Sequence, residues 1–313
     1  MTSAAAVLRS GSATDQGLHR ERNEDRIWAD DFSRTYLVVD GLGGHAGGEL
    51  AAQTAVDAIV RELKTGAGAD PESAVRAAIA AANNDIYALA QQDPANAGMA
   101  CVLTLAVFRE ERVTVGHVGD SRLYLVWNGG MRKLTSDHSP VGELEDGGEL
   151  TDAEAMQHPR RNEVFRDVGS CERGPGDHDF IEIRTFPFHS SAALLLCTDG
   201  LSDALTSAEI GAIVQTFDDD AAAVAQALVK AANLRGGNDN VSVIFVPGPD
   251  FVGAHGAIVA AARTRHAITR MRAGPNRWKR AVGRTLWLMI GILLGMAMLA
   301  GFQQIWAWRG LIR

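Results

Sequence analysis

The stretch TYLVVDGLGGHAGGE, residues 35–49, decides the fold of this chain. Its first five residues are mainly β-branched or aromatic, a composition typical of a buried strand. The strand is expected to end at Asp40, and the glycines that follow let the backbone approach its neighbours closely. The sequence therefore predicts a strand that carries a carboxylate into a crowded turn, with a helix beginning near Glu49.

Three more aspartates stand at the ends of apolar runs. Asp120 ends VTVGHVGD, Asp199 ends ALLLCTD, and Asp239 stands directly before the run NVSVIFV. A single aspartate at a strand end is usually a turn residue, but four of them, three with a glycine neighbour, favour a common site. Carboxylates that converge without cysteine or histidine select hard divalent cations, Mg²⁺ or Mn²⁺.

The order of the elements predicts the architecture. Apolar β-rich runs are expected to form strands at residues 35–39, 102–108, 113–118, 123–127, 180–186, 193–197 and 241–246. Helical segments come in two pairs, at residues 49–64 with 72–91 and at residues 208–216 with 221–232. Consecutive strands disfavour a doubly wound parallel sheet. We therefore predict an α+β fold, a four-layer α-β-β-α sandwich of two antiparallel sheets flanked by helical pairs.

Two local features complete this interpretation. Thr206 and Glu209 are spaced as in a capping box and predict the start of the third helix. Residues 141–148 and 173–179 are rich in glycine or charge and are expected to be surface loops.

A dinucleotide-binding turn is the competing interpretation of the glycine-rich stretch. Gly41, Gly43 and Ala46 follow a strand and precede a helix with roughly the required spacing. However, Asp40 stands directly before the first glycine and would repel a pyrophosphate. The acidic residues expected about 20 positions later fall inside an apparent helix, so this interpretation is disfavoured.

The composition and charge of the chain exclude several classes of protein. The chain has 313 residues, is 46% hydrophobic and 22% charged, and is therefore globular. Its three cysteines form no Cys-x-x-Cys pair, which disfavours a disulfide framework or a cysteine-based zinc site and favours a reducing compartment. All 38 acidic residues lie before residue 251, so residues 1–250 are strongly acidic. Nucleic acid is therefore not an expected partner.

The C-terminal part of the chain predicts a membrane anchor. Residues 285–308 carry no charge, are flanked by Arg284 and Arg309, and would span about 36 Å as a helix. Basic residues concentrate before this segment, so the positive-inside rule places the large N-terminal part in the cytoplasm, on a single-pass protein of the cell membrane. The predicted organisation is a domain over residues 1–250, a basic juxtamembrane linker over 251–284, a transmembrane helix over 285–308 and a short tail over 309–313.

Taken together, the motifs resemble the metal-dependent protein phosphatases of the protein phosphatase 2C type, in their bacterial branch. The matching stretches, in order, are GLHRERNED (17–25), VVDGLGGHAGGE (38–49), VGDSRLY (118–124), LTSDHS (134–139), TDGLSD (198–203) and NDNVS (238–242). The similarity runs from about residue 12 to residue 246. It implies a Mn²⁺- or Mg²⁺-dependent enzyme with two bound ions and, in bacterial members, a third.

The resemblance also implies roles for individual residues. Asp40 matches the aspartate that bridges two ions, and Gly41 the neighbour that offers a backbone carbonyl. Asp199 and Asp239 match the other direct carboxylate ligands, and Asp120 matches the aspartate that holds the third ion with help from Asp199.

Further positions match the family at the edge of this cluster. Glu24 matches an acid that reaches the second ion directly or through water, and Asp25 supports the same cluster. Arg20 matches the arginine that binds the phosphate, with Arg22 as the neighbouring alternative. In chemical terms, a planar guanidinium can hold two phosphoryl oxygens at once.

The chain departs from the family pattern at two places. Leu42 stands where animal members have a histidine thought to act as a general acid, and His45 is not a substitute by position, so the general acid stays open. Residues 100–102, Ala-Cys-Val, replace the usual Gly-Thr-Thr and are expected to be a core variant. His138 and Ser139 match structural residues before a flap over residues 141–170, where substrate choice is expected to lie.

The resulting hypothesis is metal-activated hydrolysis of phosphoserine and phosphothreonine on proteins at the cytoplasmic face of the membrane. The expected partners are phosphorylated proteins, a cognate serine/threonine kinase and, through the C-terminal helix, the membrane. The alternative from another class is a pseudophosphatase, a membrane-tethered sensing or docking domain. The presence of Asp40, Asp199, Asp239 and Arg20 favours catalysis. A third hypothesis, in which the domain acts on small phosphate esters or drives a partner-switching cascade, has no residue in the sequence that distinguishes it.

Overall fold

A computed structural model describes residues 8–43, 47–66, 68–174, 176–177 and 179–254 of the chain. Contacts divide the chain into two units, Met1–Ala257 and Ile258–Arg313, and every described residue belongs to the first. The predicted transmembrane segment, residues 285–308, and nearly all of the basic linker lie outside the described residues. Within the described ranges, no helix is both long and apolar enough to cross a bilayer.

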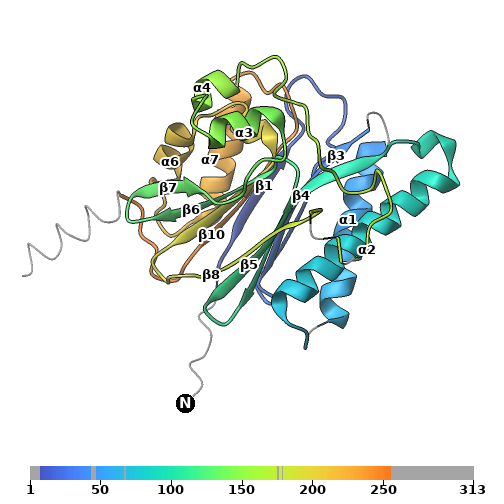
Figure 1. Cartoon of the computed structure of the whole chain (residues 1–313). Coiled ribbons are helices and arrows are strands. Elements are labelled where there is room, and N and C mark those ends of the chain that lie inside the picture. The colour runs from blue at the N-terminus through green and yellow to red at the C-terminus, as the bar shows by residue number, and fades with distance from the viewer. Residues whose placement is uncertain (1–7, 44–46, 67, 175, 178, 255–313) are drawn as a thin grey trace, which may run out of the picture. The chain divides into compact units, whose positions relative to one another are not determined.

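Two five-stranded antiparallel sheets form the centre of the domain (Figure 1). The first sheet has the order β1-β10-β9-β6-β7, with β1 Gly11–Asp15, β10 Val241–Pro247, β9 Ala193–Cys197, β6 Arg122–Trp127 and β7 Gly130–Lys133. The second has the order β2-β3-β4-β5-β8, with β2 Arg26–Asp30, β3 Thr35–Leu42, β4 Ala100–Arg109, β5 Arg112–Val118 and β8 Glu182–Pro187. The predicted pair of antiparallel sheets is therefore confirmed.

Helices cover the outer face of each sheet. The long helices α1 Gly47–Thr65 and α2 Pro71–Gln92 pack on the second sheet, and α6 Ser207–Val214 and α7 Ala221–Leu234 pack on the first. The shorter helices are η1 Pro94–Asn96, α3 Pro140–Asp146, α4 Asp152–Ala155 and α5 Asp199–Ser202. The capping box predicted at Thr206 and Glu209 begins α6, as expected.

The apolar core has three layers: one between each sheet and its helices, and one between the two sheets. Strand β3 contributes to two of them. Leu37 and Val39 pack against α1 and α2, whereas Tyr36 and Val38 pack against the first sheet. Successive side chains of a strand point to opposite faces, so a strand buried on both faces must be continuously apolar. Burial on both faces explains why residues 35–39 are continuously apolar. The four layers of the domain follow in the order helices, sheet, sheet, helices.

Several elements differ from the expectation. The prediction of a loop over residues 141–148 was wrong, because most of this stretch forms α3. Pro140 occupies the first helical turn, and the Ser139 hydroxyl accepts a hydrogen bond from the backbone N–H of Gly142, so a proline and a cap start a helix that the glycines and charges had hidden. Strands β1, β2 and β7 were not predicted. They are short and more exposed than the central strands, and they lie at sheet edges.

The two ends of the sandwich differ in composition. We call the end where β3, β5 and β9 finish and β10 begins the carboxylate end, because Asp40, Asp120, Asp199 and Asp239 stand there. We call the opposite end the hairpin end. It carries the turns between β2 and β3, between β4 and β5 and between β6 and β7.

Candidate metal centre

Four strand ends bring the predicted aspartates into one cluster at the carboxylate end. Asp40 lies near the end of β3, and Asp199 begins α5 directly after β9. The charges of Asp199 and Asp120 both act on Asp40, and the charge of Asp239 acts on Asp199. Because β3 and β9 belong to different sheets, the cluster bridges the two halves of the sandwich.

The electrostatics of the cluster fit divalent cations. Burial, and then the neighbouring Asp199, raise the pKa of Asp40 well above its ordinary value. Burial, and then Asp239, raise the pKa of Asp199 to about 6. Oδ1 of Asp199 is buried and has no hydrogen-bond partner among the described residues. Carboxylates that repel one another and keep unpaired oxygens have the donor chemistry that Mn²⁺ and Mg²⁺ require.

A crowded glycine turn directs two further oxygens to one point. A Cβ placed on Gly48 would lie 2.6 Å from Oε2 of Glu24 and 2.8 Å from the carbonyl oxygen of Gly41. The Glu24 carboxylate and the Gly41 carbonyl therefore converge where only a glycine leaves room. These two oxygens fit a shared cation, and their closeness explains why residue 48 is a glycine.

Arg20 reaches the same cluster from the loop after β1. Its guanidinium donates to Oδ2 of Asp239 at 2.6 Å, and its side chain is 47% exposed. The amide of Asn240 holds this loop in place, since it donates to the carbonyls of Gln16 and Arg22 and accepts from the backbone N–H of Glu24. Arg20 thus stands beside the ligand cluster with part of its fork open to solvent.

Asp25 has a more central place than the sequence indicated. Its side chain is buried, it accepts a hydrogen bond from the Thr198 hydroxyl at 2.9 Å, and its other oxygen has no partner among the described residues. Burial raises the pKa of Asp25 to about 7. Asp25 therefore holds the residue next to Asp199 and adds a carboxylate behind the cluster.

A small cavity adjoins Asp120. It has a volume of about 30 Å³ and is lined by Asp120, Asp199 and Asp203, among others. A space of this size holds one ion or one water molecule. No role for Asp203 was predicted from the sequence, although it follows Asp199 by one turn of helix. Arg161, from the segment after α4, donates to Oδ2 of Asp203 at 3.2 Å.

Ion pairs between buried side chains hold helix α3 beside this cavity. The Arg122 guanidinium donates to Asp137 at 2.6 Å and to Glu145 of α3 at 2.6 Å. The three side chains are 12%, 3% and 9% exposed. Lys133 adds an ion pair to Asp146 at 2.8 Å. The network attaches α3 to the strand that begins two residues after Asp120.

His138 has a structural position. Its backbone N–H donates to the Gly119 carbonyl, and its Nδ1 accepts from the Gly119 N–H. His138 also forms, with His117 and Glu182, a group that has the composition of a metal site. However, His117 Nε2 faces the Ser136 carbonyl at 3.1 Å, and His138 Nε2 lies 3.2 Å from the Arg166 guanidinium. Both rings are therefore engaged with neighbouring protein groups.

The structure brings the predicted residues together at one place. Those that meet at the carboxylate end are Arg20, Glu24, Asp40, Gly41, Asp120, Asp199 and Asp239. Leu42 ends β3 and supplies no proton, and His45 lies outside the described residues. Residues 100–102 are buried in β4, which agrees with a core variant. The flap region returns to the core where Val168 bridges Cys101.

Known proteins are similar to this chain in sequence and fold. The family model described as Protein phosphatase 2C matches residues 18–235. The serine/threonine phosphatase stp of Listeria innocua is 34% identical over 242 residues, which are 74% of this chain and 93% of that protein. The crystal structure of the Mycobacterium tuberculosis serine/threonine phosphatase PstP/Ppp matches 77% of this chain and 99% of that one, with 33% identity and a TM-score of 0.69.

A further solved structure bears on the ions. The catalytic domain of the serine/threonine protein phosphatase PstP in complex with two manganese ions matches 77% of this chain and 98% of that one, with 32% identity and a TM-score of 0.68. The matched region of the family model contains Asp40, Asp120 and Asp199.

Proposed function

The chain belongs to the protein phosphatase 2C family and is a metal-dependent protein serine/threonine phosphatase, and from this premise we propose where and how it acts. It hydrolyses phosphoserine and phosphothreonine on proteins at the cytoplasmic face of the cell membrane, to which its C-terminal segment anchors it. The convergence of Asp40, Asp199 and Asp239 with Arg20 carries the catalytic part of this proposal. It also disfavours the pseudophosphatase, because the ligand set is complete.

Each part of the cluster has a chemical task. Bound Mn²⁺ or Mg²⁺ supplies the lowered pKa of the attacking water and the positive charge that offsets the phosphoryl oxygens. Asp40 and Asp199 would hold the ions between the two sheets, and Asp239, just before β10, would complete the ligand set. The Glu24 carboxylate and the Gly41 carbonyl would supply oxygens on the other side of the site. Asp120 lines the adjoining cavity with Asp199 and would hold a third ion.

Arg20 positions the phosphate. Its ion pair with Asp239 fixes one nitrogen of the guanidinium, and the exposed remainder can donate to two phosphoryl oxygens. With the phosphate held by Arg20 beside the carboxylates that would bind the ions, no covalent phosphoenzyme is needed, because water can attack a phosphoryl group that is already oriented.

The membrane location rests on the C-terminal sequence. Residues 285–308 are uncharged and long enough to span a bilayer, and the basic residues before them favour the cytoplasm for the enzyme domain. Substrates at that surface would be phosphorylated proteins, including those modified by a cognate membrane kinase.

One experiment tests both parts of the proposal. We expect phosphate release from a phosphothreonine peptide in the membrane fraction of cells that express the full chain, with Mn²⁺ and not with EDTA. A chain without residues 285–313 should carry the same activity into the soluble fraction. Metal dependence without sedimentation would disprove the anchor alone, whereas activity that survives EDTA would disprove the metal chemistry.

Arg20 offers a test of phosphate binding that is separate from metal binding. Arg20→Ala should lower kcat/KM by about 10²-fold, mostly through KM, because it removes a charged bidentate contact. Arg20→Lys should recover only part of the loss, since a point charge cannot form the fork. The rise of Tm with Mn²⁺ should persist in both variants.

Arg22 provides the matched control. Its guanidinium is 60% exposed and lies 3.7 Å from Glu49, away from Asp239. Arg22→Ala should keep kcat/KM within about twofold of the parent chain, as expected for a solvated charge. If Arg22→Ala is the more damaging change, the phosphate contact belongs to Arg22 instead.

A further inference from the structure

An apolar groove lies between helix α7 and the edge strand β1, beside the loop that carries Arg20. It has a volume of about 490 Å³. Two leucines that line it are mostly exposed, Leu18 at 65% and Leu234 at 78%. A single exposed leucine is ordinary on a protein surface, but two that line one groove form a patch, and such patches indicate a binding surface.

The polar groups of this groove are already engaged by the protein. The Thr14 hydroxyl shares a hydrogen bond with the Ser242 hydroxyl at 2.8 Å, and the Asp15 carboxylate accepts from the Asn233 amide at 2.9 Å. Val229 of α7, which also lines the groove, is buried. Because hydrogen bonds within the domain satisfy these polar side chains, the groove offers a ligand mainly apolar contact.

Leu18 joins the groove to the place where the phosphate binds. Its N–H donates to the Gly237 carbonyl at 2.7 Å, and a Cβ placed on Gly237 would lie 2.7 Å from its Cγ. Leu18 precedes Arg20 by two residues, and Gly237 precedes Asp239 by two. Arg20 and Asp239 form the ion pair at the metal centre. The groove therefore begins at most about 7 Å along the chain from the arginine that positions the phosphate.

The dimensions of the groove suit an extended peptide. Gln226 and Leu234, which both line it, are eight residues apart on α7, and this separation corresponds to about 12 Å of helix. An extended peptide advances about 3.3 Å per residue. If its phosphorylated residue lies at Arg20, the side chains that reach the groove belong to positions roughly two to six residues away.

We propose that the groove binds an apolar side chain of the phosphoprotein substrate, on one side of the phosphorylated residue, and that Leu18, Val229 and Leu234 determine this preference. The inference rests on the phosphate contact of Arg20 in the proposed function. Leucine in place of alanine at the right position should raise kcat/KM by about 10-fold, because the larger side chain leaves water in a groove that is still partly open. The gain should come mainly through KM, since the contact lies away from the reacting atoms.

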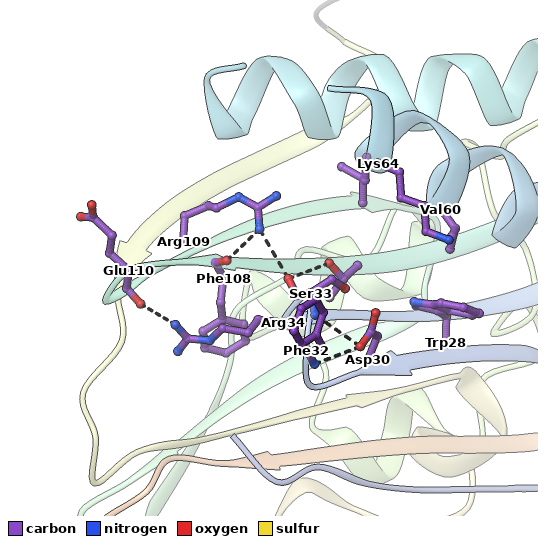
Figure 2. A pocket seen from close by; sticks show the side chains of 12 residues that line it. Trp28, Asp30, Phe32, Ser33, Arg34, Val60, Lys64, Phe108, Arg109 and Glu110 are labelled. Atoms are coloured by element: carbon purple, nitrogen blue, oxygen red, sulfur yellow. Dashed lines mark hydrogen bonds between the residues drawn. The ribbon is translucent and has the colours of Figure 1, made fainter. Parts of the chain in front are cut away.

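A cavity at the hairpin end supplies the matched control. This cavity, of about 380 Å³, opens beside Phe32, and its walls include Trp28 and Val60 (Figure 2). Phe32 is 99% exposed and precedes β3, so it lies at the opposite end of that strand from Asp40. Phe32→Ser therefore removes a large exposed apolar side chain, as Leu234→Ser does, but at a site remote from Arg20.

The test is a series of phosphothreonine peptides hydrolysed by the full chain with Mn²⁺. A single leucine moves through an alanine background, from about six residues before the phosphothreonine to about six after it. The readout is kcat/KM for each peptide divided by that for the peptide without leucine. We expect one maximum of about 10-fold, on one side only. Because each ratio compares two peptides on the same protein, a general loss of activity in a variant cancels.

The variants assign this maximum to the groove. Leu18→Ser and Leu234→Ser should each lower the ratio, and the two together should bring it to within about twofold of one. Phe32→Ser should leave the ratio and the activity unchanged. Phe165, which is 49% exposed in the segment after α4, is the competing position, and Phe165→Ser should not abolish the maximum.

Each contrary result overturns a different statement. A series without a maximum, or a maximum that survives the double leucine variant or depends on Phe165, would show that the groove does not read the substrate, while hydrolysis of the alanine peptide would still support the phosphatase. A double variant that changes the mass of the full chain in size-exclusion chromatography, and not the ratio, would make the groove an interface between copies. If no phosphothreonine peptide is hydrolysed, the proposed function fails and this inference with it.

Discussion

Asp40→Asn should lower phosphate release by about 10³-fold or more at saturating Mn²⁺, the scale expected when a charge that stabilises a phosphoryl transition state is lost. Asparagine has nearly the same shape as aspartate, so the fold stays intact while the site loses the carboxylate that lies next to both Asp199 and Asp120. The measurement is release from a phosphothreonine peptide over a titration of Mn²⁺.

The same variant should become more stable without metal. In EDTA, Asp40 and Asp199 repel one another in a site where burial already raises the pKa of both. Removing one charge relieves that repulsion, so Tm in EDTA should rise by a few degrees, which corresponds to about 1–2 kcal/mol. The further rise of Tm that Mn²⁺ gives the parent chain should be largely lost.

Asp57→Asn is the matched control for Asp40→Asn. Asp57 lies on the exposed face of α1 and accepts only a surface hydrogen bond from Gln53. Its replacement should change neither activity nor the Tm shift with Mn²⁺. Parental activity in Asp40→Asn, or an equal effect at Asp57, would remove Asp40 from the metal centre.

Arg122→Leu should destabilise the domain by about 3 kcal/mol, because it leaves two buried carboxylates without their main partner. Asp137 and Glu145 are 3% and 9% exposed and both bind the guanidinium. Lys133, 3.4 Å from Asp137, remains and keeps the loss at the lower end of the range for broken buried pairs. Urea unfolding in EDTA gives this free energy without a contribution from metal binding.

Two further variants test whether the loss of stability in Arg122→Leu comes from the burial of its ion pairs rather than from the loss of a charge as such. Arg61→Leu removes an arginine that is 52% exposed and pairs with Asp85 at 3.0 Å, and it should cost no more than about 1 kcal/mol. Arg122→Leu combined with Glu145→Leu should recover part of the lost stability, since one stranded carboxylate is gone. If Arg122→Leu costs no more than Arg61→Leu, the buried network does not stabilise the fold.

Much of the fold could be predicted because its central strands are buried on both faces. β3, β4 and β9 read as continuous apolar runs, and the ends of β3 and β9 mark Asp40 and Asp199. The edge strands β1 and β2 contain few buried residues, and β1 pairs with β10 from the far end of the domain sequence, so local pattern did not reveal them. α3 was missed because its cap and its proline, rather than its composition, start it.

The site shows a similar division. The predicted ligands could be found because each stands at a strand end beside a recognisable motif. Asp25 and Asp203 gain their importance from three-dimensional contacts, with Thr198 across the sheets and with the cavity beside Asp120. Arg161 meets Asp203 across a long separation in sequence, which no local pattern encodes. The anchor over residues 285–308 stays a prediction, because these residues lie outside the described part of the chain.

The position of the aspartates across two sheets gives the ions a second task. Asp40 belongs to β3 of the second sheet, whereas Asp199 follows β9 and Asp239 precedes β10, both strands of the first sheet. A cation held by these carboxylates would act as a non-covalent crosslink that closes the long loop between residues 40 and 199, as a disulfide would. Metal binding would then stabilise the contact between the two sheets at the place where the substrate reacts.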